Sequence, residues 1–557
     1  TNPITYNGTD NSVSIKHEDG VIYVEGDQAT GIYARNNNNA DASKVVIEYT
    51  NSAVGTTGID VRNKDVASLD ARGIGIALVN ENENYRDGYT NAGGTIKLKG
   101  DDNGALASFA KDATVGSAAS GGNYTGTSLV MGGNDIATGK NGIGIYAENA
   151  KITLKSDDFT VITKDDGVGL WVTDNSEVAK GANHTKTFQY NYFGKNDKNG
   201  FAMAFGGRNT GITHASNDLD IKFTNVNDTG VNLAYERTES KAATPTANKG
   251  TYKGIAGILV NTNDANDTVT NRGNIEEDSS SKTNIRAYGA VVNRGHFENH
   301  GNIELSDSLN EDASNVEKND LKKVNAGIIA NYHDKDAREN TWIVNHGDIK
   351  VGTKSSKNVG GFGIYGYNIE NYGKDDGTQS TITINKNSYG IYSGDGNVKI
   401  QKTKLLVGND TVLGSPTTTR TTAPATDILK GRETDAAYGV YIGDNSLLSG
   451  KNRDVEVSAD MDIDRFSYGI VLQNNANADL PGSGATTNVK IGDGLYTLDS
   501  EGKVASLIPT SSPTIVLGSN QNAGGQVKST APSNPKNEKD PLEQGNAVYY
   551  YSADKNS

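Results

Sequence analysis

A short glycine-led segment recurs throughout the chain and constrains its fold more than any other feature. Gly142–Ala147 reads Gly-Ile-Gly-Ile-Tyr-Ala, and Gly167–Val172 reads Gly-Val-Gly-Leu-Trp-Val. Apolar residues alternate with small or aromatic ones, which is typical of a β-strand with one buried face. Many neighbouring copies lie about 25–38 residues apart, the spacing of solenoid repeats. Further copies begin at Gly31, Gly73, Gly200, Gly230, Gly257, Gly327, Gly361, Gly390, Gly439 and Gly469, and Tyr precedes the glycine at Tyr288, Tyr389, Tyr438 and Tyr468.

A second repeat contains the motif Asn-x-Gly and lies between copies of the first. Phe297–Ile303 reads Phe-Glu-Asn-His-Gly-Asn-Ile and Ile343–Ile349 reads Ile-Val-Asn-His-Gly-Asp-Ile, with further copies at Val269–Ile275 and Ile369–Gly373. If the copies stack in register, the side-chain amides form a ladder at one corner, each bonding to the next. The ladder residues are Asn271, Asn299, Asn345 and Asn371. The two repeats together predict an all-β fold, a right-handed parallel β-helix (β-solenoid) with loop insertions.

The low hydrophobic content fits a repetitive fold, and the net charge limits the classes of binding partner. Only 34% of the residues are hydrophobic, but a stacked repeat needs few apolar residues in each coil. The net charge of −15 argues against nucleic acid or an anionic membrane surface as the partner. The chain has no cysteine, which favours export in the unfolded state, because a disulfide loop would obstruct a narrow membrane pore.

Some stretches are too long or irregular for one coil. We predict a β-helix over residues 1–508 and, from 509 to 557, a linker rich in Pro and Asn or a final irregular coil. Five of the ten prolines lie in that tail, where Asn546–Tyr551 could add one further strand. The predicted insertions lie near 101–138, 173–199, 236–251, 307–323 and 407–435.

Aromatic residues are the candidate ligand-binding groups. The strand pattern places Tyr33 and the candidates Tyr146, Trp171, Tyr365, Tyr392 and Tyr441 on the outer face, and Tyr190, Tyr192 and Phe193 belong to an aromatic cluster in the 173–199 insertion. One interpretation is a ladder that only shields the sheet surface. The other is a binding strip, because Tyr and Trp rings contact sugars, cations and protein hot spots.

Catalytic and metal-binding patterns are weak. The chain lacks Gly-x-Ser-x-Gly and any thiol nucleophile, so we predict no enzyme activity and no cofactor. Asp460, Asp462 and Asp464 could bind Ca²⁺ or simply form an acidic strand face. His296 and His300 share a strand face, which zinc binding would allow. Stacked corner residues, with His346 in the equivalent position to His300, are the simpler interpretation, and we predict no metal.

Glycine-led Gly-Ile-Tyr-Ala strands and Asn-x-Gly corners without cysteine resemble the passenger regions of type V autotransporters. The resemblance is strongest to the large fusobacterial outer-membrane adhesins and covers nearly the whole chain. It implies display on the bacterial cell surface after export across the outer membrane. In that family a signal peptide precedes the passenger and a C-terminal β-barrel follows it. We expect this sequence to be an excised passenger segment, with membrane contact only through that missing barrel.

The resemblance implies an adhesin that attaches to a host receptor protein, a host glycan or a surface protein of a partner bacterium. We expect a monomer. One alternative is a passive stalk that displays another adhesive module. A second alternative is a polysaccharide lyase or hydrolase, because such enzymes also use the β-helix and need grouped carboxylates and basic residues in a groove.

Overall fold

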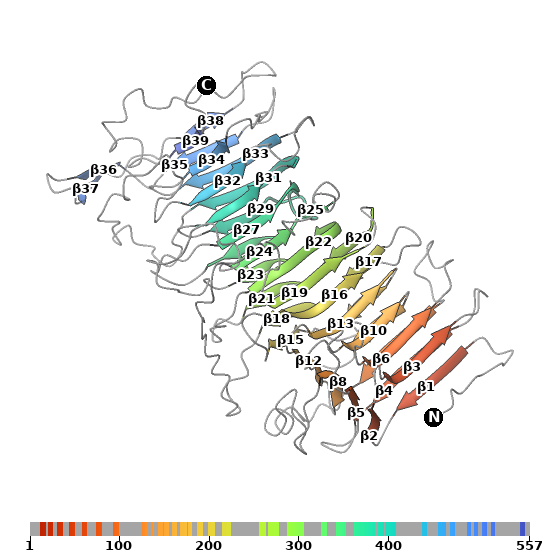
Figure 1. Cartoon of the computed structure of the whole chain (residues 1–557). Helices are drawn as coiled ribbons and strands as arrows, with labels where there is room; N and C mark the ends of the chain where they lie inside the picture. The colour runs from red at the N-terminus through yellow and green to blue at the C-terminus, as the bar shows by residue number, and fades with distance from the viewer. Residues whose placement is uncertain are drawn as a thin grey trace, which may run out of the picture. The chain divides into compact units, whose positions relative to one another are not determined.

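The computed structural model describes the strands and the short connections next to them (Figure 1). Every regular element among these residues is a β-strand, and none of them forms a helix that could cross a membrane. The predicted all-β parallel β-helix is confirmed. The described residues are 12–17, 21–25, 30–36, 44–50, 58–63, 74–80, 93–99, 125–131, 135–138, 143–148, 150–154, 159–163, 167–174, 176–180, 187–192, 199–206, 214–223, 255–262, 266–277, 287–305, 325–330, 341–352, 361–384, 388–394, 396–407, 437–442, 455–463, 468–473, 487–491, 495–498, 504–508, 514–517 and 546–551.

The chain divides into two compact units, and each is described by itself. Unit 1 comprises Thr1–Ile285 with Asn293–Gly295, and unit 2 comprises Arg286–Val292 with His296–Ser557. In both units one coil consists of up to three successive strands, and each strand pairs in parallel with its counterpart in the next coil. We call the three stacks of strands the first, second and third faces, the first being the stack of glycine-led strands.

In unit 1 the three faces follow one another in strict order along the chain (Figure 1). The first face contains β3 (Thr30–Asn36), β6 (Ile74–Asn80), β10 (Ile143–Glu148), β13 (Gly167–Thr173), β16 (Gly200–Gly206) and β19 (Ile255–Asn261). The second contains β1 (Ser12–His17), β4 (Lys44–Thr50), β7 (Gly93–Lys99), β11 (Ala150–Leu154), β14 (Glu177–Lys180), β17 (His214–Asn217) and β20 (Thr268–Asn271). The third contains β2 (Val21–Glu25), β5 (Gly58–Asn63), β9 (Asp135–Thr138), β12 (Phe159–Thr163), β15 (Thr187–Tyr192), β18 (Asp220–Phe223) and β21 (Ile275–Glu277), while β8 (Thr125–Met131) runs antiparallel between β5 and β9.

Unit 2 has the same plan, but its later strands merge two faces. The first face contains β22 (Ala287–Asn299, which bends into the second face), β24 (Asn325–Ala330), β27 (Gly361–Gly366), β30 (Tyr389–Ser393), β32 (Tyr438–Ile442), β34 (Tyr468–Gln473) and β39 (Asn546–Tyr551). The second contains β25 (Thr341–Asn345) and β28 (Asn368–Asn371), and the third contains β23 (Ile303–Leu305), β26 (Ile349–Val351), β29 (Ser380–Ile384) and β35 (Thr487–Ile491). β31 (Val398–Val407) and β33 (Val455–Ile463) continue both of these faces; β36 (Leu495–Leu498) pairs antiparallel with β37 (Val504–Ile508), and β38 (Thr514–Leu517) pairs antiparallel with β35.

The core consists of columns of apolar side chains in register. Ile145 of β10 pairs with Leu170, which pairs with Met203, and all three are fully buried. In unit 2 Ile364 pairs in the same way with Ile391 of the next coil. Each such side chain contributes about 1.5–3 kcal/mol by leaving water, so repeated columns supply a core although the chain is poor in hydrophobic residues.

A column of glycines lets the coils of the first face approach closely. A Cβ at Gly327 would lie 2.6 Å from the carbonyl oxygen of Gly363 and 2.6 Å from Cγ2 of the core residue Ile349. Gly390 has the same relation to Gly439, whose carbonyl oxygen would lie 2.5 Å from the added Cβ. Glycine is therefore favoured here by close packing of the backbone.

One predicted insertion differs from the structure, and the further strand predicted at Asn546–Tyr551 is present. Residues 173–199 contain β14 and β15, which pair in register with the coils on either side, so much of this stretch belongs to the coil. In the 509–557 tail, β39 pairs in parallel with β34. Strands β8 and β9 occupy part of 101–138, whereas the insertions 236–251 and 307–323 and most of 407–435 lie outside the described residues.

We predict that Gly327→Ala lowers the free energy of unfolding by about 1–3 kcal/mol, because the added methyl group overpacks the inside of the coil. The cost stays moderate because a methyl group can be accommodated: Ala202 occupies the equivalent position of β16, between Phe201 and Met203. Chemical denaturation of the two proteins measures the difference. Gly394→Ala is the matched control, since its Cβ would approach no heavy atom closer than 3.3 Å. Equal losses in both variants would contradict the packing argument.

Candidate functional site

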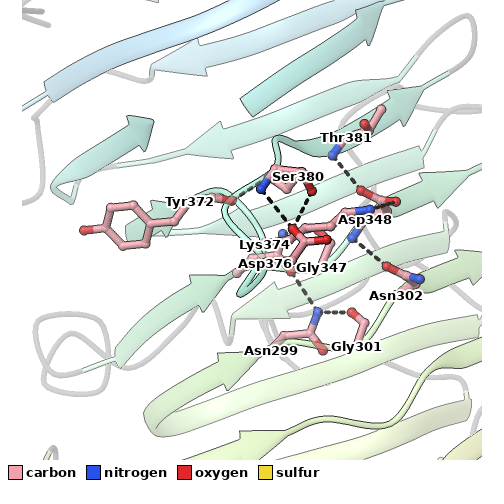
Figure 2. A network of polar contacts seen from close by, with 12 residues as sticks. Asn299, Gly301, Asn302, Gly347, Asp348, Tyr372, Lys374, Asp376, Ser380 and Thr381 are labelled. Atoms are coloured by element: carbon pink, nitrogen blue, oxygen red, sulfur yellow. Dashed lines mark hydrogen bonds and ion pairs between the residues drawn. The ribbon is translucent and has the colours of Figure 1, made fainter. Parts of the chain in front are cut away.

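The Asn-x-Gly corners of unit 2 are joined by a buried ladder of side-chain amides. Asn299 Nδ2 donates to Gly301 O at 2.7 Å and to Asn345 Oδ1 of the next coil at 2.8 Å. Asn345 Nδ2 repeats both bonds, to Gly347 O at 2.8 Å and to Asn371 Oδ1 at 2.7 Å. All three asparagines are fully buried. The predicted amide-to-amide ladder is therefore confirmed in this unit, and Figure 2 shows its Asn299 corner.

The ladder of unit 2 ends after Asn371, where hydroxyl groups take the place of the next asparagine. Asn371 Nδ2 donates to Thr403 Oγ1 at 2.7 Å and to Ser380 Oγ at 3.0 Å. The Thr403 hydroxyl group in turn donates a hydrogen bond to Gln401 O, and the Ser380 hydroxyl group donates one to Tyr372 O. Hydroxyl groups thus satisfy a buried amide where the Asn-x-Gly repeat stops, as a buried polar group requires.

Unit 1 contains a ladder whose first member the motif did not predict. Asn217 Nδ2 donates to Asn271 Oδ1 at 2.8 Å, and Asn271 Nδ2 donates to Gly273 O at 2.8 Å. Asn217 was missed because Leu219 stands where the repeat has glycine. The signal that could have found it is the order Asn-x-x-x-Ile, which Asn217–Ile221 shares with Asn271–Ile275.

The x residues of the corners in unit 2 form a second column beside the ladder. The rings of His300 and His346 lie parallel, with centroids 4.7 Å apart and planes 3° from parallel, and Tyr372 stacks on His346 with centroids 5.5 Å apart. The expectation that His300 and His346 stack one coil above another is confirmed. His296 packs instead near Trp342, with ring centroids 6.5 Å apart.

Carboxylates surround the two stacked histidines. His300 Nδ1 lies 2.8 Å from Asp375 Oδ1, and His300 Nε2 lies 3.1 Å from Glu298 Oε1. His346 Nε2 is 3.8 Å from the same Glu298 oxygen, and its Nδ1 is 3.0 Å from Gly373 O. Asp375 belongs to the turn that follows Tyr372, where Lys374 also bonds to Asp348 at 2.7 Å (Figure 2).

These contacts shift the ionisation of the cluster in opposite directions. The hydrogen bond with Glu298 raises the pKa of His300, burial opposes this effect, and the nearby Asp375 adds a smaller increase. The hydrogen bond with His300 lowers the pKa of Glu298. Burial lowers the pKa of His296, opposed by the charges of Glu298 and Glu370. Charge is therefore stabilised between Glu298 and His300 and disfavoured at His296.

Glu298, His300 and His346 could hold a metal ion, because one ligand atom from each lies within 4.8 Å of the others. The pair considered from the sequence, His296 with His300, is not the pair brought together. The interval of four residues along a strand suggested the first pair, whereas stacking between coils produces the second.

Two columns of aromatic rings cover the first face of unit 2. The candidate residues Tyr365, Tyr392 and Tyr441 stack with centroids 4.9 and 5.0 Å apart. Beside them a second column, which the candidate set did not include, contains Phe362, Tyr389 and Tyr438 with centroids 5.1 and 4.7 Å apart. Tyr392, Tyr441 and Tyr389 remain partly exposed, but Tyr365 is buried, in contrast to the expected outward exposure.

The second column exists because the strand alternation is interrupted at the glycine. The rings of Phe362 and Tyr365 touch at a right angle with centroids 5.2 Å apart, so the two residues share a face although they are three positions apart. Strict period two would place them on opposite faces. The tyrosines before glycine, at 389 and 438, were the available sequence signal. Burial raises the pKa of Tyr389 well above its ordinary value, so its hydroxyl group stays neutral.

In unit 1 the outer aromatic candidates form a smaller group. Tyr146 pairs in register with Trp171, and both side chains are partly exposed. Tyr146 donates a hydrogen bond to Glu148 Oε2 at 3.1 Å. Tyr33 of β3 is 55% exposed. These residues lie on the first face of unit 1 as the strand pattern predicts; their role in binding stays a prediction.

Two of the three candidates from the 173–199 stretch, Tyr190 and Tyr192, are not surface groups. Tyr190 and Tyr192 of β15 are buried, and Tyr190 pairs in register with the core residue Phe223, their ring centroids 5.7 Å apart. The Tyr190 hydroxyl group bonds with Thr163 Oγ1 at 2.8 Å, and burial raises the pKa of Tyr190 well above its ordinary value. The aromatic cluster was taken for a loop, whereas these tyrosines point into the coil. Phe193 lies outside the described residues.

Only one of the three aspartates considered for a calcium site, Asp460, lies with its side chain in the described part of the chain. Asp460 of β33 is partly exposed, accepts a hydrogen bond from Gln379 Nε2 at 2.6 Å and pairs in register with Lys404. The side chain of Asp462 and all of Asp464 lie outside the described part of the chain. Both alternatives for the three aspartates, an acidic strand face and a calcium site, therefore stay open.

We predict that Asn345→Ala destabilises the fold by about 1–3 kcal/mol for each buried hydrogen bond it removes. The groups that lose these bonds are Gly347 O, Asn371 Oδ1 and Asn299 Nδ2. Thermal or chemical unfolding followed by circular dichroism measures the change. Asn302→Ala is the matched control in the adjoining corner, because Asn302 is exposed and water can replace the bond that its Oδ1 accepts from Asp348 N. A loss below 0.5 kcal/mol for Asn345→Ala, the usual range of surface substitutions, would contradict the ladder as a stabilising device.

A comparison of the chain with known protein families, with curated protein sequences and with solved structures finds no match in any of the three.

Proposed function

We propose that this chain is a segment of a bacterial surface adhesin, and that its partner binds to the aromatic rings on the first face. The observation that supports the proposal is the column Tyr365–Tyr392–Tyr441, whose rings stack 4.9 and 5.0 Å apart and in which Tyr392 and Tyr441 are partly exposed beside the buried Tyr365. Tyr146 and Trp171 form a comparable pair in unit 1.

The chemistry of these rings suits a sugar-bearing or cationic protein partner. Flat aromatic faces bind sugar rings and the guanidinium or ammonium groups of proteins. The net charge of −15 favours approach of a basic surface over long distance. The partner class is therefore a receptor protein or glycan on a host cell, or a surface protein of another bacterium.

The test measures attachment of the purified 557-residue chain to host cells, to partner bacteria and to a glycan array. We expect Tyr392→Ser with Tyr441→Ser to weaken binding tenfold or more, since truncating an aromatic hot spot costs about 2 kcal/mol or more. Tyr146→Ser with Trp171→Ser tests the smaller patch of unit 1 separately. Tyr365 is left unchanged because it is buried and its loss would weaken the fold.

The matched control removes charges from another face of the same unit. Glu304→Ser with Lys350→Ser breaks an exposed ion pair of 2.9 Å on the third face, which contributes little to stability. Binding that falls with the control as much as with the tyrosine variants would contradict a first-face site. Attachment by no form of the folded chain would support the passive stalk instead.

A further inference from the structure

Three potential ligand atoms converge on one point at the surface of unit 2. They are Glu298 Oε1 at the end of β22, His300 Nε2 in the corner that follows it, and His346 Nε2 in the corresponding corner of the next coil. The carboxylate oxygen lies 3.1 Å from the first nitrogen and 3.8 Å from the second. All three side chains are partly exposed, at 34%, 19% and 21%, so an ion from solvent can reach them.

The hydrogen bonds on the far side of each imidazole determine which nitrogen faces this point. Gly373 O can only accept, so His346 Nδ1 must donate to it across 3.0 Å. The Asp375 carboxylate accepts in the same way from His300 Nδ1, with its two oxygens at 2.8 and 2.9 Å. When His300 is neutral and no longer donates from Nε2 to Glu298, both Nε2 atoms carry lone pairs. Three electron-pair donors then face one another, and a metal ion between them would relieve their repulsion.

We propose that Glu298, His300 and His346 bind a single divalent metal ion of the zinc class. Two histidines and one glutamate with an open fourth position form an established zinc ligand set. A tetrahedral ion with bonds of about 2.0–2.1 Å separates neighbouring ligand atoms by about 3.3 Å, a value that the distances of 3.1 and 3.8 Å bracket. Zinc is the probe because both imidazole and carboxylate ligands suit it.

The second layer of contacts matches that of protein metal sites. A ligating histidine commonly donates its other N–H to a carboxylate or a backbone carbonyl, which orients the ring. Asp375 does this for His300 and Gly373 O does it for His346. The two rings are parallel within 3°, and an ion must lie in the plane of each ring that binds it. Binding therefore tilts at least one ring toward the other, and His346, whose Nε2 is the more distant from Glu298, is the ring expected to move.

The experiment titrates zinc chloride into the full chain after dialysis against a chelator, with a chromophoric chelator as competitor. We expect one ion per chain with an affinity that His300→Gln combined with His346→Gln lowers at least a hundredfold. Asp375→Asn removes no ligand and should lower the affinity about 10–100-fold, as loss of an outer hydrogen bond does. Zinc should also raise the unfolding temperature of the unaltered chain and not that of the double variant.

The matched control is His296→Gln, which alters a histidine on the same strand that is not one of the three converging residues. It should leave the affinity unchanged. Circular dichroism of each variant establishes that it is folded, and Glu298→Gln, a change of nearly equal volume, provides a second test if the double variant unfolds. Equal zinc affinity and stoichiometry in the folded unaltered chain and in the folded ligand variants would overturn the proposal.

Discussion

The in-register approach of successive coils is the constraint from which the rest of this structure follows. Parallel strands lie about 4.8 Å apart, so each side chain has its counterpart in the next coil as its nearest neighbour. Glycine lies against glycine, as at Gly327 and Gly363, and asparagine bonds to asparagine, as at Asn299 and Asn345. The same residue recurs at such a position from coil to coil because it packs well against a copy of itself.

This self-matching explains why much of the fold could be predicted from the sequence. A position that must stack on its own kind appears in the chain as a repeat, and both the glycine-led strand and the Asn-x-Gly corner are such repeats. The glycine of the corner has a steric cause as well: a Cβ at Gly347 would overlap the carbonyl oxygen of Gly301 in the neighbouring coil. The parallel β-helix, the asparagine ladder and the stacking of His300 on His346 could therefore be expected before any coordinates.

What could not be predicted depends on local departures from the repeat. The second aromatic column was missed because the alternation is interrupted at the glycine, which places Phe362 and Tyr365 on one face. Tyr190 was assigned to an insertion because residues 173–199 are too long and irregular for one coil, yet its side chain is buried and Thr163 satisfies its hydroxyl group. Asp375 joined the histidine cluster through a turn whose path no sequence motif specifies. Each of these outcomes depends on three-dimensional packing that does not appear as a repeat in the sequence.

The same geometry determines at which positions such a fold can carry functional side chains. The asparagine of each corner is fully buried and bonded to its neighbours, whereas the x residue beside it projects outward and contacts the x residue of the next coil. Substitution at x therefore leaves the ladder intact. In unit 1 this column holds Asp218 and Arg272, 3.3 Å apart, and in unit 2 it holds His300, His346 and Tyr372. One backbone frame thus supports an ion pair in one unit and an imidazole pair in the other, because the residues that maintain the stack and the residues that face solvent are different.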